Sequence, residues 1–324
     1  VPANDPDLMR STTGANVFVV IVTYNGAPWI GPCLQSLLAS TESVEAIVVD
    51  NASTDDTLAI VERDFPATTV LRSAENLGFG RGNNLGIRHA LALGARYVFL
   101  LNQDAFVLPA TVAELRGFMD AHPEFGVASP LHCSPDLSQL DRRSMRGYLQ
   151  AYLLDYLGDA CVGRVQGHYK TFGINAAAWF VRAETFRTAG GFDPLFLMYG
   201  EDDDLLHRWA HHNIGFALLT GSRIVHLRQS PSAPRVGFWG DVRRRAQRAR
   251  SELLTQIKRP GHSGLHMVSV LISAGFVAPL AQALVVRSGR DYLGSLWAAL
   301  RLVMRWPALI HHARLTARRG SHFL

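Results

Sequence analysis

The chain has 324 residues, of which 48% are hydrophobic and 18% charged, with a mean hydropathy of +0.07. This length allows one large domain or two smaller ones, and the apolar content excludes intrinsic disorder as the main state. Cys33, Cys133 and Cys161 form no C-x-x-C pair. Their scatter argues against a disulfide framework and a structural zinc site, and it suits a reducing compartment. The first ten residues contain no apolar run, so no secretory signal is expected.

Charge is distributed unevenly along the chain. Residues 1–234 contain 17 Lys and Arg against 24 Asp and Glu, whereas residues 235–324 contain 15 against 3. The resulting net charges of −7 and +12 predict a basic C-terminal region that meets an anionic partner, either nucleic acid or a phospholipid surface.

Strand and helix patterns alternate from residue 17 to about residue 130. Strands are predicted at four places, over residues 17–24, 45–50, 68–73 and 95–104. Ser53 or Thr54 is expected to cap the helix after the second strand, and Gly94 to end the helix after the third. Such alternation is typical of a parallel sheet with right-handed crossovers, which binds ligands at the carboxyl ends of its strands.

The later part of the chain has a different pattern. Residues 132–170 contain Tyr148, Tyr152 and Tyr156 at helical spacing, which favours a helix face packed on the core and leaves open an insertion that faces an acceptor. The α/β pattern returns over 173–227. A Pro- and Ser-rich break at 230–234 then leads into an Arg-rich helical region.

The glycine-rich segment 76–86 invites a dinucleotide-binding interpretation, which fails. Asn83 stands at the third glycine position, and the segment follows the third strand rather than the first. A P-loop is also excluded, because no G-x-x-x-x-G-K-[ST] occurs. The glycines predict close approach either to a nucleotide or sugar, or of a helix to the sheet.

Acidic side chains end two of the predicted strands. Asp50 suits either a hydrogen bond from a pyrimidine N3–H or ribose hydroxyl, or the cap of the next helix. Asn102 and Asp104 lie two residues apart in a strand-like segment, so both can reach one metal-bound diphosphate. Hard oxygen ligands of this kind suit Mg²⁺ or Mn²⁺.

The densest candidate site is the acidic run 201–204, which follows an apolar loop and begins a helix. Four adjacent carboxylates predict raised pKa values, a nearby cation, or support from the helix N-terminus. His226 ends another strand, where it is either structural or part of a metal site.

In this order the motifs resemble a family 2 glycosyltransferase of the GT-A fold, in its rhamnosyltransferase-like branch. The matching segments are VIVTYN (20–25), CLQSL (33–37), IVVDNASTDDT (47–57), ENLGFGRGNNLGI (75–87), FLLNQD (99–104), GINAAAWFVR (173–182), GGFDPLFLMYGEDDDLLHR (190–208) and IVH (224–226). The resemblance covers roughly residues 17–230. It implies a catalytic domain over 17–230, with a nucleotide-binding half (17–105) and an acceptor half (106–230), between a short tail (1–16) and a helical region (231–324).

The resemblance also implies roles for single residues. Those implied to bind substrate or nucleotide are Thr23, Tyr24, Asn25, Asp50, Asn76, Gly78, Asn83, Asn102, Gln103 and Trp179. Asp104 and His226 are implied to hold Mn²⁺ or Mg²⁺, although the first metal-motif position is Asn102 rather than Asp. Asp202, paired with Glu201, is the implied general base of an inverting transfer. Leu205 stands where processive relatives have Gln, which disfavours processive synthesis.

The C-terminal region contains two apolar segments, 265–286 and 292–310. The first is long enough to span a bilayer, and the second combines Arg301 and Arg305 with tryptophans. Attachment to the membrane interface is preferred over a packing helix, and a packing helix over a true span. The arginines expected to face anionic lipid are Arg243, Arg244, Arg245, Arg248 and Arg250. Nucleic acid is not expected as a partner, since the acidic half would repel it.

The sequence therefore predicts a cytoplasmic transferase, peripheral on the inner face of the cell membrane, in polysaccharide biosynthesis. Rhamnose from a dTDP donor and a glycan or lipid-linked acceptor are expected. A UDP-sugar donor, or a non-catalytic nucleotide-sugar-binding scaffold, is the alternative, and homo-oligomerisation stays open.

Overall fold

A computed structural model describes residues 16–142, 145–227, 237–286 and 289–324 of the chain. Almost all of the predicted N-terminal tail (1–16) and the whole Pro- and Ser-rich break (230–234) lie outside these residues.

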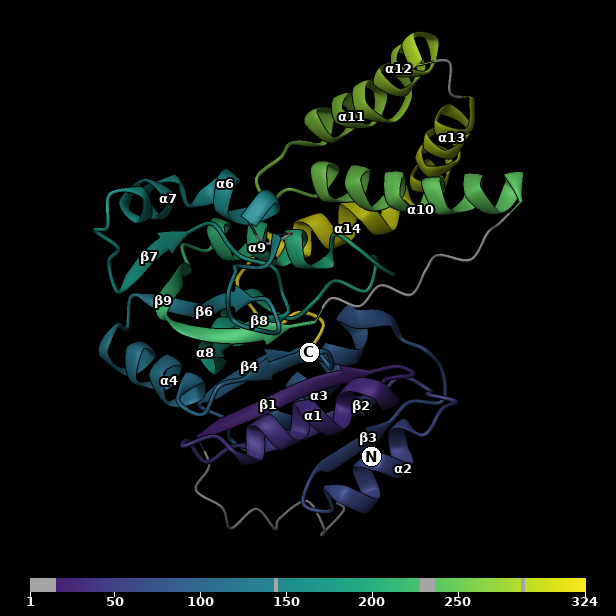
Figure 1. The fold of residues 1–324 in the computed structure, drawn as a ribbon. Helices are drawn as coiled ribbons and strands as arrows, with labels where there is room; N and C mark the ends of the chain where they lie inside the picture. Colours follow the sequence, from purple (N-terminus) through teal and green to yellow (C-terminus); the bar gives the residue numbers. More distant parts are fainter. Residues whose placement is uncertain (1–15, 143–144, 228–236, 287–288) are drawn as a thin grey trace.

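The described residues form one nine-stranded sheet (Figure 1). Its strands are β1 (Val17–Thr23), β2 (Glu45–Asp50), β3 (Thr69–Arg72), β4 (Tyr97–Leu101), β5 (Ala105–Val107), β6 (Phe125–Cys133), β7 (His168–Thr171), β8 (Ala178–Arg182) and β9 (Gly215–His226). The order along the sheet is β3-β2-β1-β4-β8-β6-β9-β5, and β7 pairs with β9. The first four strands run parallel, as predicted, while β8 is antiparallel to both its neighbours.

Helices cover both faces of the sheet. Those of the sheet domain are α1 (Ala27–Leu38), α2 (Thr57–Asp64), α3 (Gly78–Ala92), α4 (Thr111–Ala121), α8 (Ala183–Ala189) and α9 (Glu201–His211). Alternate residues of β1 explain the two layers. Phe18 and Val20 pack with α3, α8 and α9, whereas Val19 and Ile21 pack with α1, α2 and α4. The VFVVIVT run is apolar at every position but the last because both faces of this strand are buried.

Two local predictions are wrong. Neither Ser53 nor Thr54 caps α2, because the helix begins at Thr57 and both residues bond Asn25 instead. The three tyrosines do not share one helix, since the chain forms the π-helix η2 (Met145–Leu149), then α6 (Gln150–Tyr152) and α7 (Leu154–Cys161). Tyr156 is buried in the core and Tyr148 packs against it, whereas Tyr152 is exposed.

The C-terminal region is helical, as predicted. Its elements are α10 (Phe238–Ile257), α11 (Gly264–Ile272), η3 (Ser273–Val277), α12 (Ala278–Val286), α13 (Gly289–Met304) and α14 (Trp306–Thr316). In Figure 1, α11, α12 and α13 form an arm that projects from the sheet domain, whereas α14 lies against it. A third apolar cluster joins Leu195 and Phe196 of the sheet domain to Leu253, Ile257 and Leu302, which attaches the helical region to the loop before α9.

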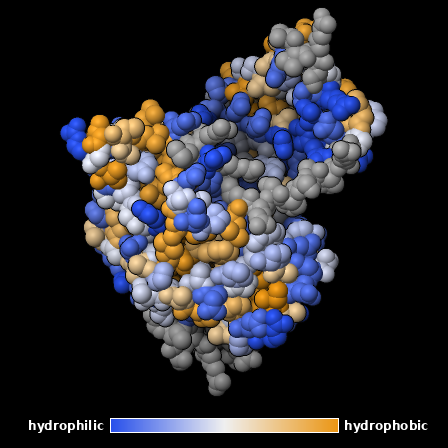
Figure 2. All heavy atoms as spheres, in the orientation of Figure 1, coloured by the Kyte–Doolittle hydropathy of each residue, from blue (hydrophilic) through white to orange (hydrophobic). Residues whose placement is uncertain are grey.

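The arm carries exposed apolar side chains. Residues Gly264–Gln282 form a helical stretch that is long and apolar enough to cross a membrane, with 17% of its most apolar window buried. Leu265 is 86% exposed and Leu284 74% exposed. Figure 2 shows hydrophobic and hydrophilic residues side by side on the upper part of the molecule, which contains the arm. The prediction that five arginines of α10 face lipid needs correction, because Arg250 is buried and Arg245 forms ion pairs with Asp241 and Asp291.

Candidate active site

The loops after β1 and β4 meet at the carboxyl edge of the sheet, because these parallel strands are neighbours. Thr23 Oγ1 donates a hydrogen bond to Gln103 Oε1 at 2.6 Å, and the backbone N–H of Tyr24 donates to the same oxygen at 3.1 Å. Gln103 therefore holds the β1 loop with its carboxamide oxygen. Tyr24 remains 47% exposed at this edge, which leaves its ring free to contact a ligand.

Asp50 and Asn25 shape the next turn along the edge. The buried carboxylate of Asp50 accepts a hydrogen bond from the backbone N–H of Ser53 at 3.2 Å, so it fixes the turn after β2. Asn25 adopts a left-handed backbone with φ of 46°, and its Oδ1 accepts from the N–H of Thr54 at 2.9 Å. The two predicted residues thus hold the β1 and β2 loops against each other.

The glycine-rich loop is fixed by amide side chains. Asn76 Oδ1 accepts a hydrogen bond from the N–H of Gly78 at 2.9 Å. Asn51, which directly follows Asp50, donates from Nδ2 to the carbonyl of Gly78 at 3.2 Å and accepts from Leu77. Gly78 has a φ of +79°, and a Cβ there would lie 2.6 Å from the Leu197 carbonyl oxygen. Both the backbone conformation and the space therefore require glycine.

Later glycines of this segment serve helix packing. A Cβ on Gly86 would lie 2.3 Å from Val20 Cγ1, and one on Gly82 would lie 2.8 Å from Val22 Cγ1. Of the two interpretations left open by the sequence, close approach of the helix to the sheet therefore holds for both glycines. Gly80 brings the start of α3 to the acidic run, because its Cβ would lie 3.6 Å from Glu201 Cβ.

Two predicted binding residues lie away from this edge. Trp179 is fully buried in the core, and its indole N–H donates to the Ile174 carbonyl at 2.7 Å. Asn83 is buried in α3 and donates to the carbonyl of Phe79, one turn earlier. Both side chains are buried and hydrogen-bonded to the backbone within the core, so neither is included in the proposed site.

The two predicted metal ligands lie together. His226 Nε2 is 3.4 Å from Asp104 Oδ1, because β5 pairs antiparallel with β9 and sets Ala105 opposite His226. His226 Nδ1 is 3.6 Å from Asp141 Oδ2 on its other side. Within the described ranges, no group of three His, Cys, Asp or Glu side chains is arranged to hold a metal ion. Asp104 and His226 nevertheless fit an Mn²⁺ or Mg²⁺ ion that takes its remaining ligands from a diphosphate.

The acidic run at the start of α9 is strongly desolvated. Burial, followed by the neighbouring Asp202 carboxylate, raises the pKa of Glu201 to about 7, and the same two causes raise the pKa of Asp203 to about 6. Burial also raises the pKa of Asp202, whose carboxylate accepts hydrogen bonds from the N–H of Asp203 and from the Tyr148 hydroxyl at 3.5 Å. The run therefore contains proton acceptors with shifted affinities.

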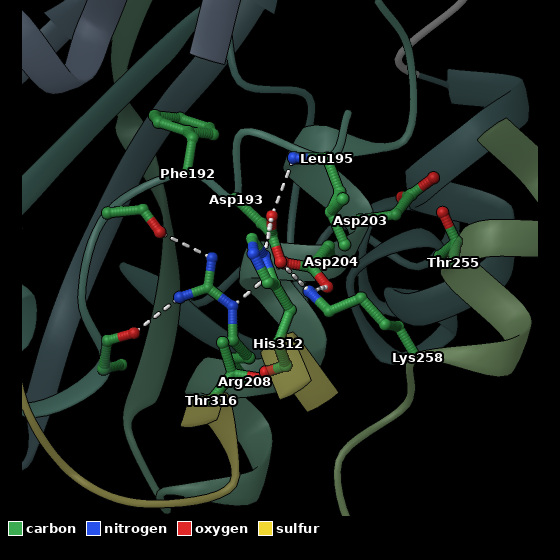
Figure 3. A network of polar contacts seen from close by, with 12 residues as sticks. Phe192, Asp193, Leu195, Asp203, Asp204, Arg208, Thr255, Lys258, His312 and Thr316 are labelled. Carbon is green, nitrogen blue, oxygen red and sulfur yellow. Dashed lines mark hydrogen bonds and ion pairs between the residues drawn. The ribbon is translucent and has the colours of Figure 1, made fainter. Parts of the chain in front are cut away.

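Asp204 has a different role, because it belongs to a buried ion network (Figure 3). Its carboxylate accepts from Arg208 Nε at 2.9 Å and from Lys258 Nζ at 2.8 Å. Lys258, from the end of α10, also pairs with Asp193 in the loop before α9, and His312 of α14 lies 2.8 Å from Asp193. Burial opposes ionisation of Asp193, but Lys258 and His312 outweigh it and hold its pKa below the usual range. The C-terminal helices are thereby bonded to the loop that carries the acids.

A cavity of about 690 Å³ opens beside the acidic run. Asp203 and Tyr199 line it from the sheet domain, Tyr152 and Phe172 add aromatic rings, and Arg259 faces it from the residues after α10. Arg259 Nε donates to His207 Nε2 at 3.1 Å. Burial, followed by Arg259, lowers the pKa of His207 to about 4, so the imidazole is neutral near pH 7. This combination of rings, a carboxylate and a cation suits a polar ring such as a sugar.

Sequence reasoning gave no role to Asn51, and it missed Asp141, Lys258 and His312. Asn51 directly follows the predicted residue Asp50, and an amide side chain at the end of a strand could have indicated its role. Lys258 is one of only two lysines in the chain, and the other, Lys170, is exposed. Nothing in the order of residues joins Lys258 or His312 to Asp193, which lies far away in the sequence.

The mixed sheet with helices on both faces has the GT-A fold of nucleotide-sugar transferases. Solved structures share this fold. S. aureus TarS (1–349) aligns with a TM-score of 0.57 at 15% identity, over 93% of this chain and 88% of TarS. The mannosyltransferase PcManGT from Pyrobaculum calidifontis, solved with GDP-Man and Mn²⁺, aligns with a TM-score of 0.55 at 19% identity, over 94% and 84%.

Residues 18–173 match the model of Glycosyl transferase family 2. N-acetylglucosaminyl-diphospho-decaprenol L-rhamnosyltransferase of Mycobacterium tuberculosis is 27% identical over 208 residues, 58% of this chain and 68% of that protein. The dTDP-rhamnosyl transferase RfbF of Shigella flexneri is 29% identical over 129 residues, 38% and 41% of the two chains. Residues 18–173 therefore match a family 2 glycosyltransferase domain, as the motifs predicted.

Proposed function

We propose that the enzyme transfers rhamnose from dTDP-rhamnose, with inversion and with a divalent metal ion, to a lipid-linked acceptor in polysaccharide synthesis. The names of the M. tuberculosis and S. flexneri relatives support this donor sugar, and the former supports a diphosphate-linked lipid acceptor. A UDP-sugar is the alternative donor.

The position of Asp202 carries the proposal. On one side, Glu201 packs against Gly80 at the start of α3, beside the predicted nucleotide loop. On the other side, Asp203 lines the 690 Å³ cavity. Asp202, which stands between these two residues in the chain, is therefore the residue to which we assign the role of general base.

The donor nucleotide is proposed to bind along the edge formed by the loops after β1, β2 and β4. Tyr24 offers an exposed ring for the base. The Asp50 carboxylate keeps acceptor sites beyond its bond to the Ser53 N–H. Asn76 and Gly78 lie where the glycine-rich loop turns, next to the proposed diphosphate. Asp104 and His226 would hold Mn²⁺ or Mg²⁺, which stabilises negative charge on the leaving diphosphate.

In the reaction, the acceptor hydroxyl gives its proton to the Asp202 carboxylate. The freed oxygen bonds to the anomeric carbon, and the bond from that carbon to the diphosphate oxygen breaks on the opposite face. The raised pKa of Asp202 suits this task, because a base of higher proton affinity takes the proton more readily. Tyr148 orients the carboxylate through its hydroxyl.

The arm formed by α11, η3, α12 and α13 is proposed to attach the enzyme to the inner face of the cell membrane. Its exposed apolar side chains and the basic charge of the C-terminal region support this placement. Attachment there would give the acceptor cavity access to lipid-linked substrates.

The test is a transfer assay with dTDP-rhamnose, Mn²⁺ and a short-chain prenyl-diphosphate N-acetylglucosamine. Wild type should form a product whose anomeric configuration is inverted relative to the donor, by NMR. Asp202→Asn should bind donor as wild type does and lose about 10²–10⁴-fold in rate. No transfer from any dTDP- or UDP-sugar, with donor binding intact, would instead favour the non-catalytic scaffold.

A further inference from the structure

A second cavity, of about 350 Å³, lies between α10, α13 and the loop before α9. It is lined by Leu197, Arg243, Gln247, Arg250, Trp297 and Arg301, so three guanidinium groups face one small space. Neither the donor edge nor the 690 Å³ cavity includes any of these side chains.

The positive charge of this arginine pocket is not compensated. Arg250 is only 9% exposed, and its Nη2 donates to the Leu195 carbonyl at 2.9 Å. Burial, then Arg305 and Arg301, lower the pKa of Arg250. Among the described residues, no carboxylate pairs with Arg243, Arg250, Arg301 or Arg305, whereas Arg245 of the same helix has two carboxylate partners. Like charges gathered around a buried cation repel one another, and a bound anion would relieve that repulsion.

The geometry of the pocket suits a phosphate group. Arg301 lies over the ring of Trp297 at 5.0 Å, which fixes the direction of its guanidinium group. Planar guanidinium groups bind phosphate oxygens in pairs, and several of them converging on one point match a phosphate or diphosphate. At about 350 Å³ the cavity is at the small end of ligand sites, which favours a headgroup over a whole nucleotide sugar.

The surroundings indicate that this phosphate carries an apolar chain. Three exposed apolar residues lie close to Arg301 in the sequence of α13, namely Leu300, Val303 and Met304. A ligand with its phosphate on the arginines can therefore lay a hydrocarbon chain on the same helix. On its inner side the pocket touches the loop that leads to Glu201, because Arg250 bonds Leu195 and Ser251 bonds the Met198 carbonyl at 2.9 Å.

We propose that this arginine pocket binds the phosphate group of a lipid. An anionic phospholipid and the diphosphate of a lipid-linked acceptor both supply this chemistry. The second source rests on the proposed function, whereas the pocket itself does not. A ligand seated there would press the arm against the loop before α9 and hold the acids in place.

The experiment is a calorimetric titration of the full chain with inorganic pyrophosphate, in EDTA and without donor. The Arg243→Gln/Arg301→Gln double variant removes two exposed guanidinium groups, so it should fold as wild type does. Arg314→Gln, on the exposed side of α14, is the control for loss of charge. We expect the double variant to bind at least tenfold more weakly and Arg314→Gln to bind as wild type does. Binding of pyrophosphate at the donor edge would contribute the same heat in all three proteins, so it would not produce a difference between them.

Two further experiments distinguish the two possible sources of the lipid phosphate. Geranyl diphosphate should displace pyrophosphate if the pocket takes a prenyl diphosphate. Vesicles of phosphatidylcholine with 20 mol% phosphatidylglycerol, compared with pure phosphatidylcholine, should retain wild type better than the double variant if it takes a phospholipid. Equal pyrophosphate affinity in wild type and the double variant would overturn the proposal, as would an equal loss in Arg314→Gln. Because no sugar is present, either failure leaves the transferase proposal untouched.

Discussion

Substitution of Lys258 tests the contribution of the buried ion network to the stability of the fold. It is fully buried, and its ammonium group joins Asp193, in the loop before α9, to Asp204 inside α9 (Figure 3). Lys258→Met keeps much of the side-chain volume and removes the charge. Asp193 would keep His312, and Asp204 would keep Arg208, but the buried network would hold one uncompensated negative charge.

Removal of one partner from a buried ion pair costs about 3–5 kcal/mol. At about 2 °C per kcal/mol for a chain of this size, Tm should fall by about 6–10 °C. Differential scanning calorimetry would measure this shift. Lys170→Met is the matched control, since Lys170 is exposed, and it should change stability by less than about 0.5 kcal/mol.

The loss of stability in Lys258→Met should depend on pH, and its direction follows from the pKa of Asp193. Lys258 and His312 hold the folded pKa of Asp193 below its usual value. In wild type this contributes stability that is present above the unfolded pKa of about 3.9 and is lost as the pH falls below it. The variant lacks most of that contribution, so its Tm deficit should stay constant from pH 7 to about 4 and shrink as the pH is lowered from 4 to 2.

A double variant separates charge from packing. Lys258→Met/Asp193→Asn has no excess buried charge, so it should lose less stability than the sum of its two single changes. A Tm for Lys258→Met within 1 °C of that for Lys170→Met, or a deficit that is equal at pH 2 and pH 7, would refute this reasoning.

Three other changes test other parts of the structure. Gly86→Ala should cost about 1–3 kcal/mol in urea unfolding, because its Cβ would meet Val20, whereas Gly117→Ala in α4 meets nothing within 4 Å and should stabilise the chain. Glu201→Gln should raise Tm at pH 8 and barely change it at pH 4. The folded pKa of about 7 penalises the ionised form by about 3 kcal/mol, a loss of stability that sets in as the pH rises from 4.5 through 7. Asp104→Asn should weaken Mn²⁺ binding in the presence of dTDP about 10–100-fold by titration, and an unchanged affinity would remove Asp104 from the metal site.

The sheet domain was predictable because its signals are local. Each of the first four strands is an apolar run followed by polar residues, and parallel pairing brings those residues to one edge. Thr23, Asp50 and Gln103 accordingly lie there. The pairing of Asp104 with His226 was also predictable, although only through the family resemblance, since β5 and β9 lie far apart in the chain.

Tertiary packing decided what the sequence left open. Trp179 lies in a matching motif but is buried, because β8 runs through the middle of the sheet, and no local pattern distinguishes a core tryptophan from one that binds a sugar. Asp204 resembles Asp202 in sequence, yet the register of α9 turns it toward Arg208 and Lys258. The sequence predicts the C-terminal helices as a separate basic region, whereas Lys258 and His312 bond them to the loop before α9.

Donor binding tests the central claim most directly, namely that the edge holding Asp104 and His226 binds a nucleotide sugar with a divalent metal ion. The measurement is calorimetric titration with dTDP-rhamnose, UDP-glucose and UDP-N-acetylglucosamine, each with and without Mn²⁺. The account predicts Mn²⁺-dependent binding that favours the dTDP-sugar and is weakened in Asp104→Asn. Binding of none of the three donors with Mn²⁺ present would contradict it.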